Sequence, residues 1–373
     1  MSDRKLLIVG GGIAGMSLAI RMRAQAWNVD IAEIDPDWRV YGAGISIMQP
    51  TFRAAKRLGI FDELCAHGYA SHQGVRICAP DGQLIGEIPV VPIEPGLPTA
   101  GGIMRPVLHD ILSSHTRAAG AKARLGTTIS SFSESNSRVR VELTDGTRGD
   151  YDLVVGADGA SSKMRRMLFP DVPEPQYTGQ YCWRLVAQRP ADIQGVHFYV
   201  AGHVTAGLMP ISQEQMYMFL LQSSREKFRI DDATQWQLLR ELMSPFTGVL
   251  GKIRDGLSSN ASVIGRPLAA LLLPRPWSRG RVLLIGDALH ATTPHLASGA
   301  GISIEDALVL SEELSGQGEV LSALRRFEER RWERCRLVVE NSVRIGQMQQ
   351  DQADPAERHR LMAVSEAALR QEI

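Results

Sequence analysis

Residues 5–15 read Lys-Leu-Leu-Ile-Val-Gly-Gly-Gly-Ile-Ala-Gly, an apolar run followed directly by a glycine-rich turn. The apolar run 5–9 is typical of a strand that is buried on both faces of a sheet. It leads directly into the pattern G-x-G-x-x-G, which is satisfied by Gly10, Gly12 and Gly15. A strand that runs into such a turn predicts the start of a Rossmann-type α/β unit.

The residues that follow complete this unit. Apolar positions over 14–23 predict a helix, and the alternation over 28–34 predicts a second strand. Near the end of that strand, Glu33 is where a carboxylate accepts hydrogen bonds from an adenosine ribose, and Ile34 follows it. A carboxylate there would repel a 2′-phosphate, so we expect the site to bind FAD or NAD and not NADP.

Each glycine of the turn has a physical task in such a unit. Gly10 permits the tight turn, Gly12 lets the backbone approach a pyrophosphate, and Gly15 allows close contact between helix and strand. The phosphates then lie at the helix N-terminus beside Ile13 and Ala14, where free N–H groups and the helix dipole favour negative charge.

A second motif occurs in the middle of the chain. The apolar run 151–157 predicts another buried strand, and it is followed by Asp158, Gly159, Ser162 and Arg165. Asp-Gly favours a turn, the serine can cap a helix, and the arginine adds a cation one helical turn later. On its own, this stretch is equally typical of an ordinary strand–turn–helix connection.

A third motif lies in the last third of the chain. Residues 281–285 predict a buried strand that ends in Gly286 and Asp287, and an Asp at a strand end suits a sugar-like hydroxyl. Pro294 follows, and then a helix start rich in small residues whose N–H groups can point at the anionic edge of a flavin ring: Gly299, Ala300 and Gly301.

Together, the motifs at 10–15, 158–165 and 286–307 resemble those of the single-component FAD-dependent aromatic hydroxylases, the para-hydroxybenzoate and salicylate hydroxylase family. Gly44, within 42–45, resembles a residue of that family's flavin-edge loop. Arg105 resembles an arginine that lies beside the FAD. The resemblance spans about residues 1–345.

The resemblance implies a reaction. NADH or NADPH would reduce the FAD, O2 would add at flavin C4a, and the resulting hydroperoxide would hydroxylate an aromatic ring. It also implies that Asp158 and Arg165 lie by the pyrophosphate, Asp287 by the ribitol and Pro294 beside the flavin ring. Salicylate-type members continue from this proline with a Gly/Gln/Ala-rich run, whereas Ala297 replaces a glycine here.

The resemblance also implies an α/β fold, in which a Rossmann-like FAD-binding domain carries an inserted, mostly antiparallel substrate domain and C-terminal helices. We expect the FAD-binding domain at 1–75, 101–175 and 276–320, the substrate-binding domain at 76–100 and 176–275, and the helical segment at 321–373. Strand-like runs separated by turns between 181 and 221 predict the antiparallel sheet. Mixed charges over 322–350 are most typical of a solvated helix face.

The proposed substrate residues are less well defined by the sequence. His295 directly follows the ring-side proline and could act as a base, and we group Pro294, His295 and Tyr217 as candidate catalytic residues. Candidate substrate-binding residues are Met48, Met209, Tyr217, Phe219 and His295. Core packing is an equally good explanation for Tyr217 and Met209. Because no strongly basic cluster stands in the expected pocket wall, we expect a phenol, hydroxybenzoate or hydroxypyridine and not a dianion.

Composition excludes several classes of partner. Lys plus Arg (41) equals Asp plus Glu (41), which argues against binding to nucleic acid or to an anionic membrane. The 4 cysteines have no metal-ligand spacing, so we expect no metal site and a reducing, cytoplasmic location. We expect a monomer or homodimer whose partners are an aromatic substrate, O2 and NAD(P)H.

Two alternatives remain open. The same fold serves flavin halogenases and flavin reductases, although halogenases carry a W-x-W-x-I-P segment and Trp183 stands in Tyr-Cys-Trp-Arg-Leu. The second alternative is a flavin-binding regulatory module that catalyses no reaction. The sequence does not identify the substrate, the ring position that is attacked, the choice between NADH and NADPH, or whether a substituent is expelled.

Overall fold

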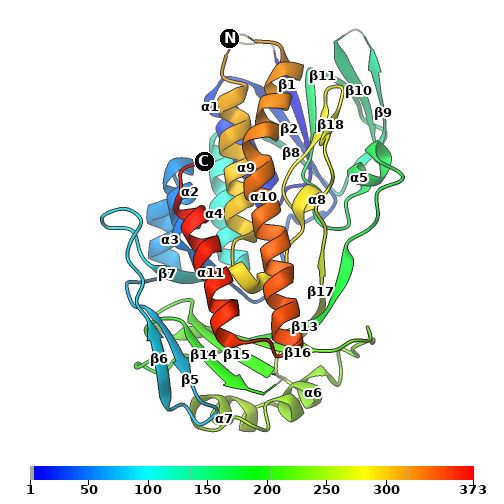
Figure 1. Ribbon diagram of the computed structural model, residues 1–373. Helices are drawn as coiled ribbons and strands as arrows, with labels where there is room; N and C mark the ends of the chain where they lie inside the picture. Colours follow the sequence, from blue (N-terminus) through cyan, green and yellow to red (C-terminus); the bar gives the residue numbers. More distant parts are fainter. Residues whose placement is uncertain (1–3, 136, 203, 317) are drawn as a thin grey trace.

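The computed structural model describes residues 4–135, 137–202, 204–316 and 318–373. Its elements form two main sheets with helices packed around them (Figure 1). This arrangement confirms the predicted α/β class. None of the helices formed by the described residues is long and apolar enough to cross a lipid bilayer.

The first sheet is the Rossmann-type sheet, with strand order β18-β19-β12-β1-β2-β8. Its central strand, β1, pairs in parallel with β12 on one side and β2 on the other. Leu6 and Ile8 of β1 are fully buried, as the apolar run predicts. The strands are β1 (Lys5–Val9), β2 (Asn28–Glu33), β8 (Lys122–Leu125), β12 (Leu153–Gly156), β18 (Ser278–Arg279) and β19 (Val282–Leu284).

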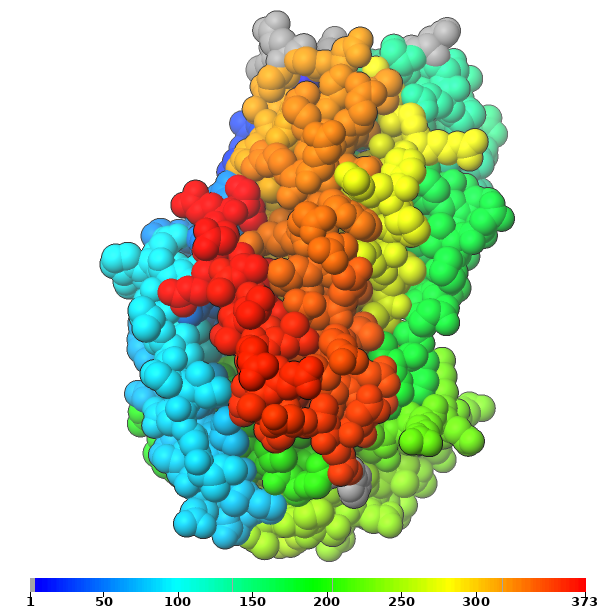
Figure 2. Space-filling model, viewed as in Figure 1, coloured from blue at the N-terminus to red at the C-terminus, as the bar shows by residue number. Residues whose placement is uncertain are grey.

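Helices pack against this sheet and against one another. Helix α1 (Ile13–Ala24) contacts α4 (Arg105–Ala118) and α9 (Gly299–Glu313), and α10 (Val320–Gln350) lies along α9 (Figure 1). In the view of Figure 2, the last helix, α11 (Pro355–Arg370, red), lies between α10 (orange) and the segment that carries β5 and β6 (light blue).

The second main sheet is seven-stranded, with order β17-β13-β16-β15-β14-β5-β6. Every neighbouring pair is antiparallel except β14 and β5. One face packs on α6 (Gln235–Leu242) and α7 (Gly248–Asp255). The strands are β5 (Val75–Cys78), β6 (Leu84–Ile88), β13 (Gln176–Gln188), β14 (His197–Ala201), β15 (Val204–Pro210), β16 (Gln215–Ser223) and β17 (Ile264–Ala270).

A small sheet, β3-β7-β4, connects the two parts: β7 contacts β15 and β3 contacts β16. Another small sheet, β11-β10-β9, adjoins the Rossmann-type sheet. Their strands are β3 (Gly44–Met48), β4 (Tyr69–Ser71), β7 (Ala100–Met104), β9 (Ile129–Ser135), β10 (Arg138–Leu143) and β11 (Arg148–Tyr151). The remaining helices are α2 (Gln49–Leu58), α3 (Phe61–His67), α5 (Lys163–Leu168), α8 (Asp287–His290) and the 3-10 helix η1 (Pro294–Leu296).

Residues 75–88 thus join residues 176–270 in one sheet although they are far apart in sequence. This is the arrangement expected for a discontinuous substrate domain, whose exact boundaries stay a prediction. The expectation of a solvated helix over 322–350 is wrong for one charge: Arg331 is fully buried in α10. It pairs with Glu305 and Asp306 of α9, and a carboxylate pair compensates a buried guanidinium.

Candidate active site

The three sequence motifs meet at the carboxyl ends of β1, β12 and β19, which are neighbours in the sheet. Gly10 has φ +107°, and a Cβ there would overlap the carbonyl of Ala157, just before the second motif. Gly286 has φ +63°, and a Cβ there would lie 2.8 Å from the Cβ of Ala14. Both positions need glycine because φ is positive and a segment distant in sequence packs closely against each of them.

The turn after β1 has room for phosphate groups. Gly12 is exposed, and no protein atom lies within 4 Å of where its Cβ would be. Helix α1 begins at Ile13 without a side-chain cap, so its first N–H groups are free to bind an anion. Ala14 and Gly15 are buried beneath this turn, and Gly15 packs against the carbonyl oxygen of Gly10.

The predicted adenosine side is ordered around Glu33. Its Oε2 accepts a hydrogen bond from Gly11 N (2.6 Å), and its Oε1 accepts one from Asp35 N (2.8 Å). Buried Trp38 donates from Nε1 to Gly11 O (2.9 Å) and so fixes the same turn. The Ile34 side chain is 69% exposed beside this carboxylate. Sequence reasoning missed Trp38, which only the folded loop brings to Gly11.

The middle motif mainly holds loops in place. Asp158 accepts hydrogen bonds from Ser162 Oγ and Met164 N, which cap α5, and Gly159 has φ +77° in the same turn. Arg165 is 1% exposed. It donates to Ala288 O (3.1 Å) and to Ala160 O (2.8 Å), and it pairs with Glu174. These contacts tie the middle motif to the late motif and favour a positioning role for Arg165 over direct contact with the cofactor.

At the late motif, Asp287 begins α8 with an accessible side chain. Burial by the surrounding protein raises the pKa of Asp287, against the attraction of His290 and Arg105. Arg105 is also accessible, and burial followed by repulsion from Arg184 lowers its pKa. Both side chains are therefore accessible to solvent although protein atoms surround them. Arg105 lies over Gly42, where a Cβ would come within 2.8 Å of its Cδ.

A buried charged network supports the late motif from behind. Asp306 Oδ2 accepts from Gly286 N (2.9 Å) and pairs with His290 Nε2 (2.7 Å), and its Oδ1 accepts from Arg331 Nε (2.9 Å). Burial opposes a charge on His290, but Cys335 and Asp306 outweigh this effect and raise its pKa. Ligand atoms of His290, Asp306 and Cys335 lie within 4.8 Å of one another. Both carboxylate oxygens are already engaged, however, and the guanidinium of Arg331 disfavours a metal ion there.

The start of α9 lies beside this loop. Gly299 and Ala300 are half-buried, and Gly301 is buried against the Thr51 hydroxyl of α2. The late motif thereby packs against α2, the helix that comes after the flavin-edge loop in the sequence.

Four of the five predicted substrate residues lie together. Met48, Met209, Tyr217 and Phe219 belong to one apolar cluster between β3 and the seven-stranded sheet. Met209 pairs with Tyr217 across β15 and β16, so the two side chains lie on the same face. A Cβ on Gly44 would lie 2.6 Å from the Cβ of Tyr217, which places the flavin-edge strand directly against this wall.

Arg184 also lies in this wall, and sequence reasoning missed it. In the β13–β16 register it is opposite Phe219 and two residues from Val186, which is opposite Tyr217. Its Nε donates to Tyr217 Oη (3.1 Å). The sequence did contain a signal for it: a charged residue stands among apolar residues of a strand, at a position whose alternation directs its side chain inward. The sequence indicates no strongly basic cluster for this wall, but the structure brings two arginines to it: Arg184 and Arg105 act on each other electrostatically beside Tyr217.

His295 points elsewhere. Its Nδ1 lies 2.9 Å from Thr293 Oγ1, and its Nε2 faces Gly346 of α10, 3.0 Å from where a Cβ would be. Burial lowers the pKa of His295 to about 4. Its contacts are those of a neutral side chain that positions the loop; a role as base stays a prediction. Pro294, next to it, is exposed, and Ala297 ends η1 with φ +47°, the left-handed conformation that glycine adopts more easily.

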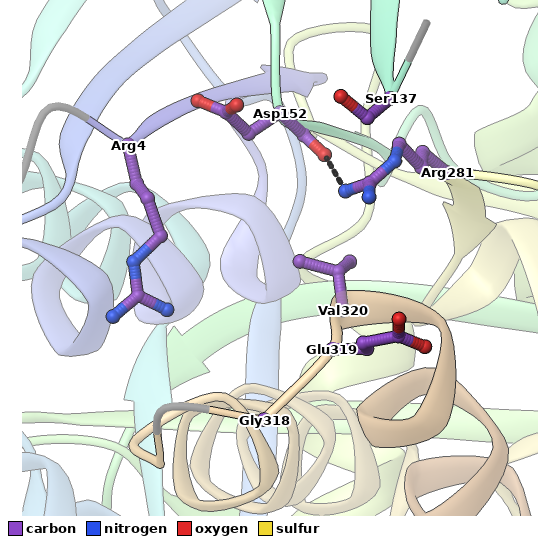
Figure 3. Close-up of a pocket in the computed structure, with 7 residues that line it drawn as sticks. All are labelled: Arg4, Ser137, Asp152, Arg281, Gly318, Glu319 and Val320. Carbon is purple, nitrogen blue, oxygen red and sulfur yellow. Dashed lines mark hydrogen bonds between the residues drawn. The ribbon is translucent and has the colours of Figure 1, made fainter.

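A separate depression lies at the amino ends of the parallel strands, away from the three motifs (Figure 3). Arg4 precedes β1, Asp152 precedes β12 and Arg281 precedes β19, and Arg281 Nη1 donates to Asp152 O (3.1 Å). Because ligands of such sheets bind at the carboxyl ends of the strands, we assign no cofactor role to this depression.

Known proteins share this sequence and fold. The FAD binding domain family matches residues 3–342. Aurachin C monooxygenase/isomerase of Stigmatella aurantiaca is 32% identical over 362 residues, which cover 92% of this chain and 89% of the relative. The 6-hydroxynicotinate 3-monooxygenase of Bordetella bronchiseptica is 27% identical over 349 residues, which cover 90% of this chain and 89% of the relative.

Among solved structures, the Klebsiella pneumoniae protein HpxO in complex with FAD and uric acid superposes with a TM-score of 0.83 at 22% identity. The superposition covers 99% of this chain and 93% of that protein, and it shows a shared fold. Sequence motifs, fold and relatives agree that the chain is an enzyme that binds FAD: it belongs to the FAD binding domain family, among the flavoprotein monooxygenases and aromatic hydroxylases.

Proposed function

We propose that this FAD-dependent monooxygenase uses NAD(P)H and O2 to hydroxylate an electron-rich aromatic or heteroaromatic ring. The observation that carries the proposal is the proximity of two surfaces. Arg105 interacts electrostatically with Asp287 of the late motif and with Arg184 and Tyr217 of the wall. The apolar wall of Met48, Met209 and Tyr217 also lies against Gly44. The apolar wall suits an aromatic ring, and the surface formed by the motifs of the Rossmann-type sheet suits a flavin.

The residues present fit FAD. Gly12 leaves open space at a helix N-terminus for a pyrophosphate, and Glu33 is fixed at the end of β2 for a ribose. Asp287 and Arg105 would hold the ribitol and the adjoining part of the cofactor, with Pro294 and the start of α9 at the flavin ring. FAD bound there would accept a hydride from NAD(P)H and activate O2 for transfer of one oxygen atom.

The protein residues would position and desolvate the reactants. Met209, Tyr217 and Phe219 would hold the ring of the substrate against the flavin-edge strand. The buried network behind Gly286 keeps the late loop rigid, because Asp306 fixes both the backbone and His290. A rigid loop holds Pro294 in place, so the reacting atoms meet without reorganisation.

The names of two relatives support heteroaromatic substrates: one relative is a 6-hydroxynicotinate 3-monooxygenase and another a 2-heptyl-3-hydroxy-4(1H)-quinolone synthase. We therefore propose a hydroxylated benzene, pyridine or quinoline ring. The test is a screen of such ligands by perturbation of the flavin spectrum and then by stimulated oxidation of NADH and NADPH. A product that gains one oxygen atom supports the proposal. Halogen incorporation, or tight FAD binding without stimulated turnover, would replace it with one of the alternatives.

A further inference from the structure

The wall of the proposed substrate pocket contains a guanidinium that has no carboxylate partner. Arg184 donates from Nε to Tyr217 Oη (3.1 Å) and from Nη1 to Cys182 O (3.3 Å). Within residues 4–135, 137–202, 204–316 and 318–373, no Asp or Glu forms an ion pair with it, and its Nη2 makes no hydrogen bond. A donor is therefore left free on this face of the sheet.

The surroundings of Arg184 are apolar. The β-sheet register places it on the same face as Phe219 and Val186, with Ile264 opposite it on β17. Val186, Phe219 and Ile264 belong to the same apolar cluster as Met48 and Phe198. A charge enclosed in such a setting is costly unless an opposite charge compensates it.

The neighbouring groups do not supply that opposite charge. Burial raises the pKa of Tyr217 to about 12, so its hydroxyl is neutral at physiological pH. Cys182 is fully buried, which raises the pKa of its thiol, so it is neutral as well. Arg105 adds a second positive charge, whose repulsion by Arg184 contributes to the lowered pKa of Arg105. Asp287 attracts Arg105, but no described carboxylate acts on Arg184.

We propose that Arg184, oriented by Tyr217, is a specificity-determining residue that binds a singly charged anionic oxygen of the aromatic substrate, either a ring carboxylate or an ionised ring hydroxyl. This inference rests on the proposed function and names its substrate class. The guanidinium would donate from Nη2 to the oxygen while Tyr217 holds Nε, so that the ring lies over Phe219. Binding in this way would also favour the ionised form of a ring hydroxyl, and the ionised form makes the ring more electron-rich than the neutral one.

The experiment measures binding of matched ligand pairs to the FAD-loaded protein by isothermal titration calorimetry at about pH 9. One pair is benzoate and benzamide, which tests the carboxylate. The other is ionised 4-cyanophenol and benzonitrile, which tests the ring oxygen. A charge-assisted hydrogen bond predicts at least about tenfold tighter binding of one anion than of its neutral partner. Arg184→Gln should abolish that preference, and Arg184→Lys should retain part of it.

Arg266→Gln is the matched control, because Arg266 is an exposed arginine on the neighbouring strand β17. It should keep the preference for the anion. Wild-type protein that binds neither anion better than its neutral partner would overturn the proposal, and so would Arg184→Gln protein that keeps the preference. Loss of FAD from Arg184→Gln would also overturn it, since the arginine would then hold the cofactor. The proposed function fails separately, if no ligand stimulates NAD(P)H oxidation in protein that still discriminates anions.

Discussion

Tyr217 Oη accepts a hydrogen bond from Arg184 Nε at 3.1 Å, and this contact joins strands β13 and β16 on the face that meets Gly44. The phenol orients a charge that the apolar wall does not otherwise compensate. Substrate recognition in this account therefore depends on the sheet, whereas cofactor binding depends on the loops at the ends of β1, β12 and β19.

Tyr217→Phe removes the acceptor and leaves the Arg184 Nε–H without a partner in a largely buried setting. Hydrogen bonds to charged groups contribute about 1.5–3 kcal/mol, so the variant should unfold at a lower temperature while FAD remains bound. Tyr199→Phe is the control, because Tyr199 is buried in the same sheet and its hydroxyl bonds to no described residue. Equal losses in the two variants, measured by calorimetry, would show that the Arg184 contact adds nothing.

Gly12→Ala and Gly10→Ala should separate cofactor binding from folding. A Cβ at Gly12 meets no protein atom, so the alanine variant should fold normally but obstruct the pyrophosphate. A Cβ at Gly10 would overlap Ala157, and its φ of +107° suits glycine alone, so that variant should lose stability even without FAD. FAD-to-protein ratios and thermal unfolding of the apoprotein provide the two readouts. A Gly12→Ala protein with normal FAD content would show that the pyrophosphate binds elsewhere.

His295 should make the free energy of unfolding depend on pH. Its folded pKa of about 4 lies below the ordinary value of 6.5, so the unfolded chain binds the proton more readily. The free energy of unfolding should then fall as the pH drops from about 6.5 to about 4, by up to about 3 kcal/mol, and stay flat above that range. Urea titrations across this window should show a weaker decline in His295→Gln. Its control, His115→Gln, alters a partly exposed histidine that pairs with Glu63. An unchanged decline in His295→Gln would place the protonation elsewhere.

Gly346→Ala tests the contact between α10 and the Pro294 loop. The added Cβ would lie 2.7 Å from Gln180 Oε1 and 3.0 Å from His295 Nε2, so the Gln180 amide and the His295 ring must move. We expect altered flavin absorbance and at least about tenfold slower ligand-stimulated turnover, because small displacements of a reacting group are costly. The control is Gly256→Ala at the end of α7, where a Cβ meets no atom closer than 3.5 Å. Wild-type turnover in Gly346→Ala would mean that this contact does not position the loop.

The sequence was sufficient to predict the cofactor and the fold class, because these depend on local patterns. The strand–glycine–helix start around Gly10 and the carboxylate Glu33 are spaced along one short segment, and the structure brings that segment to the two later motifs. Arg165 shows the limit of this reasoning. Its motif predicts a cation near the cofactor, but Nη1 and Nη2 of its guanidinium bond to Ala160, Ala288 and Glu174.

The pairings that the sequence did not predict are long-range ones. Arg331 belongs to a helix whose alternating charges are typical of a solvated face, yet its carboxylate partners lie on α9. Arg184 and Tyr217 are on strands whose register is fixed only when the sheet forms. His295 follows Pro294 in sequence, but the 3-10 turn directs its ring towards α10.

The source of the oxygen atom in the product tests the proposed function most directly. Holoprotein is incubated with NAD(P)H, a stimulating aromatic ligand and 18O2, and the product is analysed by mass spectrometry. The proposed function predicts a hydroxylated ring that carries one oxygen atom from 18O2, with one NAD(P)H consumed per product. A product whose oxygen comes from water, or NAD(P)H oxidation that yields no oxygenated ring with any stimulating ligand, would contradict it.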